Sequence, residues 1–175
     1  MHRRPIYLAL FSTTIASMAF YHSSSVLATK SSGYKSTVLA VGRYDETDIV
    51  NALPQIPNGR ENTQARLSLR ATKASSDIYV QNNVWAPGGS TGWHSHPGQS
   101  LIIVTAGAIT DYEGHDPACK PHVYKTGKAF VDPGGDHIHI LRNEGAVEAM
   151  TIAVQFIPAD ATRRIDVADP GNCHF

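Results

Sequence analysis

The feature that most constrains this chain is a pair of histidines one residue apart, His94 and His96, with a third, His139, further along. Side chains of a β-strand alternate between its two faces, so both imidazoles of a His-x-His pair on a strand project to the same side. Three neutral imidazoles that converge from two strands suit a first-row transition metal and leave coordination positions open for substrate or dioxygen. The histidines therefore predict a metal site between two strands.

Turn residues divide the chain into many short segments with strand character. Clusters such as Pro87-Gly88-Gly89 and Pro133-Gly134-Gly135 recur at roughly the 8–12-residue spacing that is typical of a sandwich or barrel. Helix signals are weak, with at most one turn at 47–53, and 51–63 is expected to be a long exposed loop. The predicted strands are 38–41, 65–70, 78–85, 93–96, 101–105, 108–112, 122–124, 129–131, 137–141 and 148–157.

Glycines and further polar residues frame the histidines in two half-motifs. These are Gly88-x5-His94-x-His96-x3-Ser100-x6-Gly107 and Gly127-x5-Pro133-x-Gly135-x3-His139-x3-Asn143. Their order and spacing resemble the two half-motifs of the cupin superfamily. The resemblance implies an all-β, antiparallel double-stranded β-helix, that is, a cupin or jelly-roll barrel. It also implies one bound divalent transition ion, Fe, Mn, Ni, Cu or Zn, with His94, His96 and His139 as ligands.

The chain departs from the cupin pattern at two places. Metal-binding cupins supply a glutamate ligand where this chain has Ser100, and the usual second half-motif has one residue fewer before its histidine. The ending His139-x3-Asn143 places the ligand at His139. A barrel that has lost its metal and kept histidines that hydrogen-bond one another is the alternative. The residues that could supply an oxygen ligand instead of glutamate are Gln99, Asp111 and Glu113.

A further histidine, His137, precedes His139 by two residues on the same predicted strand and is expected to face the site. It is a candidate fourth ligand or, because a histidine pKa is near neutral, the catalytic base that takes a substrate proton. Asp132 and Asp136 flank the neighbouring Pro-Gly-Gly turn. Turn formation accounts for both of these aspartates without a role in the site.

The first 28 residues are expected to be a signal peptide. Arg3 and Arg4 form a positive start, 6–21 is an apolar segment, and Val26-Leu27-Ala28 is a small-residue cleavage site. This layout predicts a periplasmic or secreted protein with one domain over 29–175. It leaves Sec and twin-arginine export open, and an uncleaved membrane anchor is the alternative.

Composition narrows the class of partner. Cleavage would remove two arginines and no acidic residue, leaving 13 Lys and Arg against 15 Asp and Glu. The exported chain would carry a charge of about −2 and no basic patch, which argues against nucleic acid and anionic membrane as partners. A small molecule is therefore the expected partner. Cupins often pair edge to edge, so a homodimer is compatible with the resemblance.

Two cysteines, Cys119 and Cys173, follow the predicted leader. An even number of cysteines in an oxidising compartment is expected to form a disulfide. This bond would tie the polar C-terminal tail to the loop that carries Cys119, since the tail has too few apolar residues to dock by burial alone. The alternative is a second metal or thiolate site made by Cys119 and His122.

Resemblance to small single-domain cupins implies a metal-dependent, dioxygenase-like enzyme that oxidises or cleaves a small aromatic or enolic molecule. The absence of the motif glutamate at Ser100 favours a rival from another class. That rival is an exported module that binds a small molecule or stores metal without turnover. Oxygen uptake separates the two hypotheses, because only the enzyme consumes dioxygen.

Overall fold

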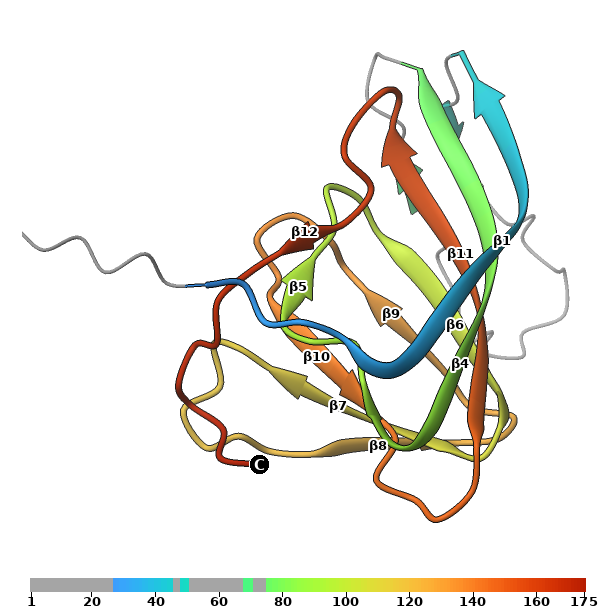
Figure 1. Cartoon of the computed structure of the whole chain (residues 1–175). Coiled ribbons are helices and arrows are strands. Elements are labelled where there is room, and N and C mark those ends of the chain that lie inside the picture. The colour runs from blue at the N-terminus through green and yellow to red at the C-terminus, as the bar shows by residue number, and fades with distance from the viewer. Residues whose placement is uncertain (1–26, 46–47, 51–67, 71–74) are drawn as a thin grey trace, which may run out of the picture.

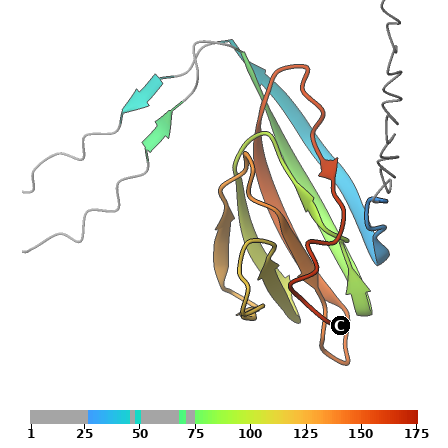
Figure 2. The ribbon, with the colours of Figure 1, turned by 90° about the vertical axis from the view of Figure 1, so that its left-hand side faces the viewer.

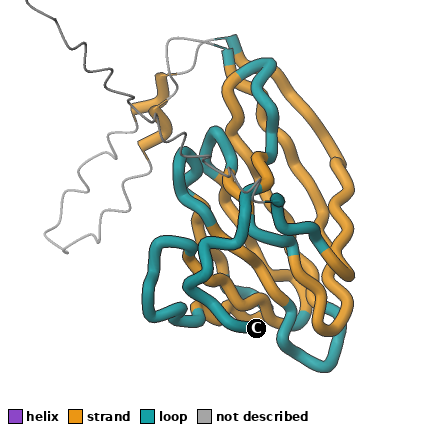
Figure 3. Tube along the Cα trace, turned by 60° about the vertical axis from the view of Figure 1, so that its left-hand side comes forward, coloured by secondary structure: helices purple, strands orange, loops and turns teal. Residues whose placement is uncertain are grey.

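The computed structural model of this chain describes residues 27–45, 48–50, 68–70 and 75–175. The predicted loop at 51–63 and most of the predicted leader lie outside the described residues. The described part contains strands, turns and loops without any helix (Figure 3). It accordingly has no helix long and apolar enough to cross a membrane.

Ten antiparallel strands form one sheet network that closes most of the way into a barrel. Figure 1 shows its two sides, with β1, β4 and β11 along one and β5, β10 and β7 along the other. The first side has the order β1 (Ser32–Tyr44), β4 (Ser76–Ser90), β11 (Ala149–Pro158), β6 (Ser100–Ala106) and β9 (Ala129–Asp132). The second has the order β12 (Ile165–Asp166), β5 (His94–Ser95), β10 (His139–Arg142), β7 (Ala108–Glu113) and β8 (His122–Lys125).

The two sides meet where Arg142 of β10 pairs with Ser90 of β4. The three longest strands, β1, β4 and β11, lie side by side in both views (Figures 1 and 2). This arrangement confirms the predicted all-β double-stranded β-helix. It also brings residues from both half-motifs to the interior.

Alternation along the strands builds the core. On β11 every second residue from Ala149 to Ile157 is buried and the residues between are half-buried. This pattern follows from the period of two in a strand, which presents one face to the barrel interior. The main apolar cluster occupies one end of that interior and consists of Trp85, Ile102, Val104, Ile109, Phe130, Leu141, Ala149 and Ala153.

Two local expectations need correction, and one strand has no counterpart among the predicted strands. The helical turn predicted at 47–53 is wrong where the chain is described, because β2 (Asp48–Val50) pairs with β3 (Ser68–Arg70). The strand predicted at 137–141 begins only at His139, since a turn follows the Pro-Gly-Gly sequence. No local pattern predicts β12, which forms by pairing with β5 rather than through its own composition.

The C-terminal tail is held by a disulfide and by burial. Cys119 and Cys173 are disulfide-bonded, with their Cα atoms 5.3 Å apart. Neither cysteine therefore offers the thiolate that a Cys119–His122 site requires. Cys173 is buried beside Trp93 and Tyr112, and the Phe175 ring lies 4.9 Å from that of Tyr112. Phe175 itself is 57% exposed, so these contacts accompany the disulfide, and the expectation that the tail does not dock by burial alone stays a prediction.

Candidate metal centre

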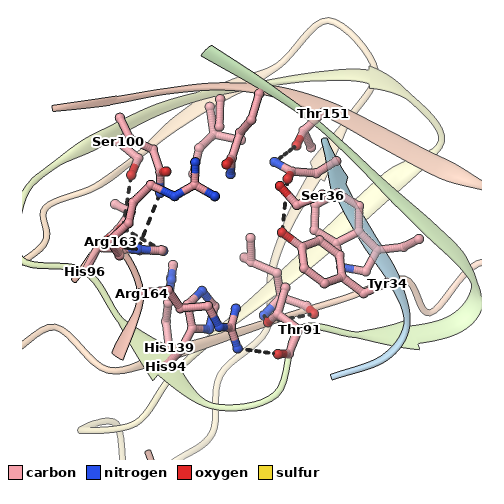
Figure 4. Close-up of a pocket in the computed structure, with 18 residues that line it drawn as sticks. Tyr34, Ser36, Thr91, His94, His96, Ser100, His139, Thr151, Arg163 and Arg164 are labelled. Atoms are coloured by element: carbon pink, nitrogen blue, oxygen red, sulfur yellow. Dashed lines mark hydrogen bonds and ion pairs between the residues drawn. The ribbon is translucent and has the colours of Figure 1, made fainter. Parts of the chain in front are cut away.

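The structure brings His94, His96 and His139 together inside the barrel (Figure 4). His94 of β5 and His139 of β10 are direct cross-strand partners, with ring centroids 4.6 Å apart. His96 follows β5, and its ring centroid lies 4.9 Å from that of His94. All three side chains are buried, and one nitrogen of each lies within 4.8 Å of the others. The two half-motifs thus meet as the sequence predicts.

Backbone carbonyls orient two of the rings. His94 Nδ1 lies 2.9 Å from the Gly92 carbonyl oxygen, and His96 Nδ1 lies 2.7 Å from the Arg163 carbonyl oxygen. A carbonyl oxygen can only accept, so in a neutral ring Nδ1 carries the proton and Nε2 keeps its lone pair. Metal-binding histidines are commonly oriented by a hydrogen bond from the other ring nitrogen. Both rings therefore offer Nε2 as a ligand atom.

His139 is the least satisfied side chain of the cluster. It is 1% exposed, and neither ring nitrogen has a hydrogen-bond partner among the described residues. Asp111 Oδ1 lies 3.5 Å from Nδ1, beyond good hydrogen-bonding geometry. A buried polar group left unsatisfied costs about 1–3 kcal/mol. A metal ion bound at one ring nitrogen of His139 would remove that cost for that nitrogen. The donor set therefore fits a transition ion.

The protonation states also fit metal binding. Burial, followed by the nearby His139 and Arg164, holds the pKa of His94 well below its usual value. The pKa of His96 is lowered mainly by burial, against the opposing effects of the Arg163 carbonyl and Asp132. Both rings are therefore neutral at pH 7, which is the form that binds a metal.

Asp132 is the site residue that sequence reasoning missed. It is 1% exposed, it ends β9, and its direct partner on β6 is Ser100, whose Oγ donates to Asp132 Oδ2 at 3.4 Å. The same Oδ2 lies 3.9 Å from His96 Nε2. The carboxylate absent at Ser100 is thus present on the neighbouring strand. The signal in the sequence was strand alternation, because Asp132 shares a face with the core residue Phe130.

Turn formation explains only part of what Asp132 does. Its Oδ1 accepts a hydrogen bond from Gly134 N at 2.9 Å, as expected for a turn. Burial raises the pKa of its carboxyl group, but the hydrogen bond with His137 and the interactions with His139, Gly134 and His96 outweigh it, so the pKa is lowered. Asp132 therefore makes contacts beyond those of the turn, and an anion stands beside the histidines.

His137 lies behind Asp132. Its Nδ1 is 3.3 Å from Asp132 Oδ1 and its Nε2 is 3.7 Å from Glu113 Oε1. The hydrogen bond to Asp132 raises its pKa against the opposing effect of burial, and the charges of Asp132, Glu113 and Asp111 add to the rise. Asp132, His137 and His139 also cluster closely enough to hold an ion. His137 does not line the cavity, so its role as a catalytic base stays a prediction.

The three oxygen donors suggested by the sequence lie around the histidines rather than among the cavity residues. Asp111 is beside His139 Nδ1, and Glu113 is beside His137. Gln99 contributes its backbone carbonyl to β11, where Phe156 N donates to it at 2.8 Å. None of the three is among the residues that line the cavity. Asp132 is the carboxylate that lines it.

The histidines open on a cavity of about 100 Å³ between the two sides of the barrel. Ligand pockets for drug-sized molecules are about 300–1,000 Å³, so this cavity suits a much smaller molecule. Three of its buried polar atoms, Gln81 Oε1, Gln155 Oε1 and Trp85 Nε1, have no hydrogen-bond partner among the described residues. The remaining lining residues include Tyr34, Ser36, Asn83, Thr91, Ile102, Leu141, Thr151, Ala153, Arg163 and Arg164.

Comparison with known proteins supports the fold. Residues 84–155 match the family model described as the cupin domain. No curated protein matches the chain.

Solved structures that match part of this chain include an oxalate oxidase, at 24% identity and a TM-score of 0.44 over 51% of this chain and 46% of the other. A cupin-like protein from Thermotoga maritima has 24% identity and a TM-score of 0.44 over 53% and 65% of the two chains. A cupin domain from Bordetella pertussis has 20% identity and a TM-score of 0.40 over 45% and 80%. This chain thus spans less than half the length of the oxalate oxidase that it matches.

Proposed function

Residues 84–155 of this chain are a cupin domain, and from that premise we propose that the protein is an exported metal-binding cupin that uses dioxygen to oxidise or cleave a small molecule. The domain carries a cluster of histidine and aspartate side chains able to hold a metal. Export is supported by the predicted leader, and the Cys119–Cys173 disulfide is compatible with an oxidising compartment.

In this proposal His94, His96 and His139 hold one divalent transition ion, Fe, Mn, Ni, Cu or Zn. The observation that carries it is His139, which is buried without a hydrogen-bond partner for either ring nitrogen among the described residues. Imidazole is a ligand suited to each of these ions. When bound, such an ion supplies Lewis acidity and, if it is redox-active, a centre for dioxygen chemistry.

Other residues of the chain have the remaining roles in this proposal. The Gly92 and Arg163 carbonyls keep His94 and His96 oriented, and the apolar end of the interior restricts water. Asp132 places a negative charge beside His96, and its cross-strand partner is Ser100, the position at which the cupin pattern has glutamate. His137 stays the proposed base. Because it contacts Asp132 and does not line the cavity, a neutral His137 with its proton on Nε2 would receive a substrate proton at Nδ1 through the Asp132 carboxylate.

Elemental analysis of protein purified without an affinity tag or chelator tests the metal site. We expect close to one transition ion per chain and a large loss of metal in His139→Ala. The matched control is His115→Ala, which removes an exposed histidine away from the cluster. A metal content well below one ion per chain that His139→Ala does not change would contradict the proposal.

Oxygen uptake by the metal-loaded protein tests turnover. A panel of small phenolic, enolic and carboxylic compounds should include at least one that stimulates uptake in the wild type and not in His139→Ala. The second candidate function, a binding or storage module, is favoured by Ser100 in place of the glutamate ligand. Thermal stabilisation that grows with the logarithm of ligand concentration, without oxygen uptake by any compound, would select that module.

A further inference from the structure

Two arginines line the cavity beside the histidines, Arg163 and Arg164. Both lie on the loop between β11 and β12, which crosses the end of the barrel next to His96. Figure 4 shows the Arg163 side chain among the residues that surround the cavity, directed toward its open centre. The cupin half-motifs end before this loop, so the metal site does not account for either arginine.

Their hydrogen bonds distinguish the two guanidinium groups. Arg164 Nη2 donates to the Thr91 carbonyl oxygen at 2.6 Å, and its Nε pairs with Asp166. Arg164 thereby fastens the loop to the barrel. The Arg163 guanidinium makes no hydrogen bond or ion pair with any residue that the structure describes. It lies 4.7 Å above the ring of Tyr79, which leaves its N–H groups free for a ligand.

The loop holds Arg163 in place from both ends. The Arg163 carbonyl accepts from His96 Nδ1 at 2.7 Å, so one residue contacts a metal ligand and also lines the cavity. At the start of the loop, Asp160 pairs with Arg43 at 2.9 Å, and Arg43 pairs with Asp77 of β4 at 2.8 Å. A side chain carried on a braced loop loses little freedom when it binds a ligand.

One positive charge at the cavity has no partner among the described residues. Arg164 is paired with Asp166, whereas the Arg163 guanidinium faces no carboxylate within ion-pair distance. Asp132 is the one carboxylate that lines the cavity, and it is already engaged by Ser100, Gly134 and His137. A divalent ion at the histidines would add further positive charge. Unpaired charge in a poorly solvated site is costly, so the cavity favours an anion.

We propose that Arg163 is an anion-recognition residue and that the ligand of this cavity is a small carboxylate. The class of reaction in this inference rests on the proposed function, but the binding of a carboxylate does not. The planar guanidinium matches a carboxylate with two parallel hydrogen bonds, and the cavity of about 100 Å³ limits the ligand to a few non-hydrogen atoms. A carboxylate thus takes the place of the aromatic or enolic substrate that the resemblance implies.

Isothermal titration with acetate and malonate, each against its neutral amide, acetamide and malonamide, tests the proposal. The protein is titrated both stripped of metal by chelator and loaded with Zn²⁺. The metal-free wild type should bind malonate at least about tenfold more tightly than malonamide, a factor that corresponds to about 1.4 kcal/mol. This arm needs no metal, so its result is independent of whether the proposed metal function holds.

Variants of Arg163 assign the preference to that residue. Arg163→Gln should abolish the malonate-to-malonamide preference, and Lys128→Gln, which removes one positive charge from an exposed site, should leave it unchanged. If circular dichroism shows that Arg163→Gln does not fold, Arg163→Lys is the substitute. It keeps the positive charge without the two parallel N–H donors of the guanidinium, and it should show a reduced preference for malonate over malonamide. An unchanged preference in the folded Arg163 variant would overturn the proposal. So would tighter binding of inorganic phosphate than of malonate, or carboxylate binding confined to the Zn²⁺-loaded protein.

Discussion

The two ends of the barrel interior are built by the same strands and differ only in the residues that those strands carry. On β10, Leu141 belongs to the apolar cluster and His139, two residues earlier, to the candidate metal centre. On β11, Ala149 lies in the apolar cluster and Gln155 lines the cavity. A strand with one inward face can thus supply stability at one end and chemistry at the other. A change of residue type, and no change of backbone, separates the two.

The two ends also differ in how completely they are satisfied. The apolar end contains Val104, Ile109 and Phe130, which are buried in one cluster and do not line the cavity. The polar end buries the nitrogens of His139 and the Oε1 atoms of Gln81 and Gln155 without hydrogen-bond partners among the described residues. Such groups lower stability unless a ligand meets them. We therefore expect mutations to be costly at the apolar end, and ligands to be stabilising at the polar end.

The largest expected effect on stability is at the apolar end. Ile109→Ala removes a fully buried side chain and should lower the free energy of unfolding by about 2–5 kcal/mol. Ile103→Ala, whose side chain is 50% exposed on β6, is the matched control and should change it by less than about 0.5 kcal/mol. Denaturant titration of metal-free protein measures both. Equal effects would remove the distinction between the two faces of these strands.

The disulfide tests whether the polar end depends on the tail. Cys119→Ser with Cys173→Ser should cost about 2–4 kcal/mol, the typical contribution of a disulfide. Hydrogen exchange should show lost protection in 165–175 and little change in β4 and β11. The tail pairs with β5 beside His94, but the histidines are also held by β10, so metal binding should persist. Protection lost throughout β4 and β11 would show instead that the tail supports the whole barrel.

Two aspartates on the same turn sharpen the comparison further. Asp132→Asn removes the buried anion next to His96 and should weaken metal binding by about 10–100-fold, as the loss of a supporting group typically does. Asp136→Asn changes an exposed carboxyl group across the turn and should leave affinity unchanged. Competition with a chromophoric chelator measures both affinities. Equal affinities of the two variants would mean that Asp132 serves only the turn.

The smallest effect is expected away from both the apolar cluster and the candidate metal centre, at Asp77. Hydrogen bonds from Arg43 hold the pKa of Asp77 below its ordinary value of 3.8, against the opposing effect of burial. The ion pair therefore contributes stability above about pH 4, and this contribution is lost as pH falls through the lower pKa of the folded state. Denaturant titration between pH 7 and pH 3 should show a shallower decline in Asp77→Asn than in the wild type. An identical decline would exclude this pair as a source of acid sensitivity.

The fold was predictable because its determinants are local. Strand alternation and turn residues are visible in any short window, and the His94-x-His96 pair shows its shared face directly. The helical turn expected at 47–53 is wrong over the described residues 48–50, because pairing with 68–70 makes them a strand. Pairing with a distant segment leaves no local pattern. β12 was not predicted for the same reason, because its partner β5 is distant in the sequence.

The site was predictable only where one motif specifies it. The three histidines follow from spacing, but Asp132 is brought to them by the cross-strand register that pairs it with Ser100. Because Asp132 stands beside a Pro-Gly-Gly turn, turn formation alone accounted for it. Its contact with Ser100 cannot be read from the local sequence. Arg163 was missed because the loop that carries it lies outside both half-motifs and reaches the cavity through tertiary contact with His96.

The central claim is that the polar end of the barrel is a metal centre. Anomalous diffraction from crystals of Zn²⁺-loaded protein tests it most directly, because it locates the ion without reference to activity. We expect one strong peak enclosed by His94, His96 and His139, with Asp132 adjacent to it. No peak at these residues, or peaks only at the histidines outside the cluster, His115, His122 or His174, would contradict the account.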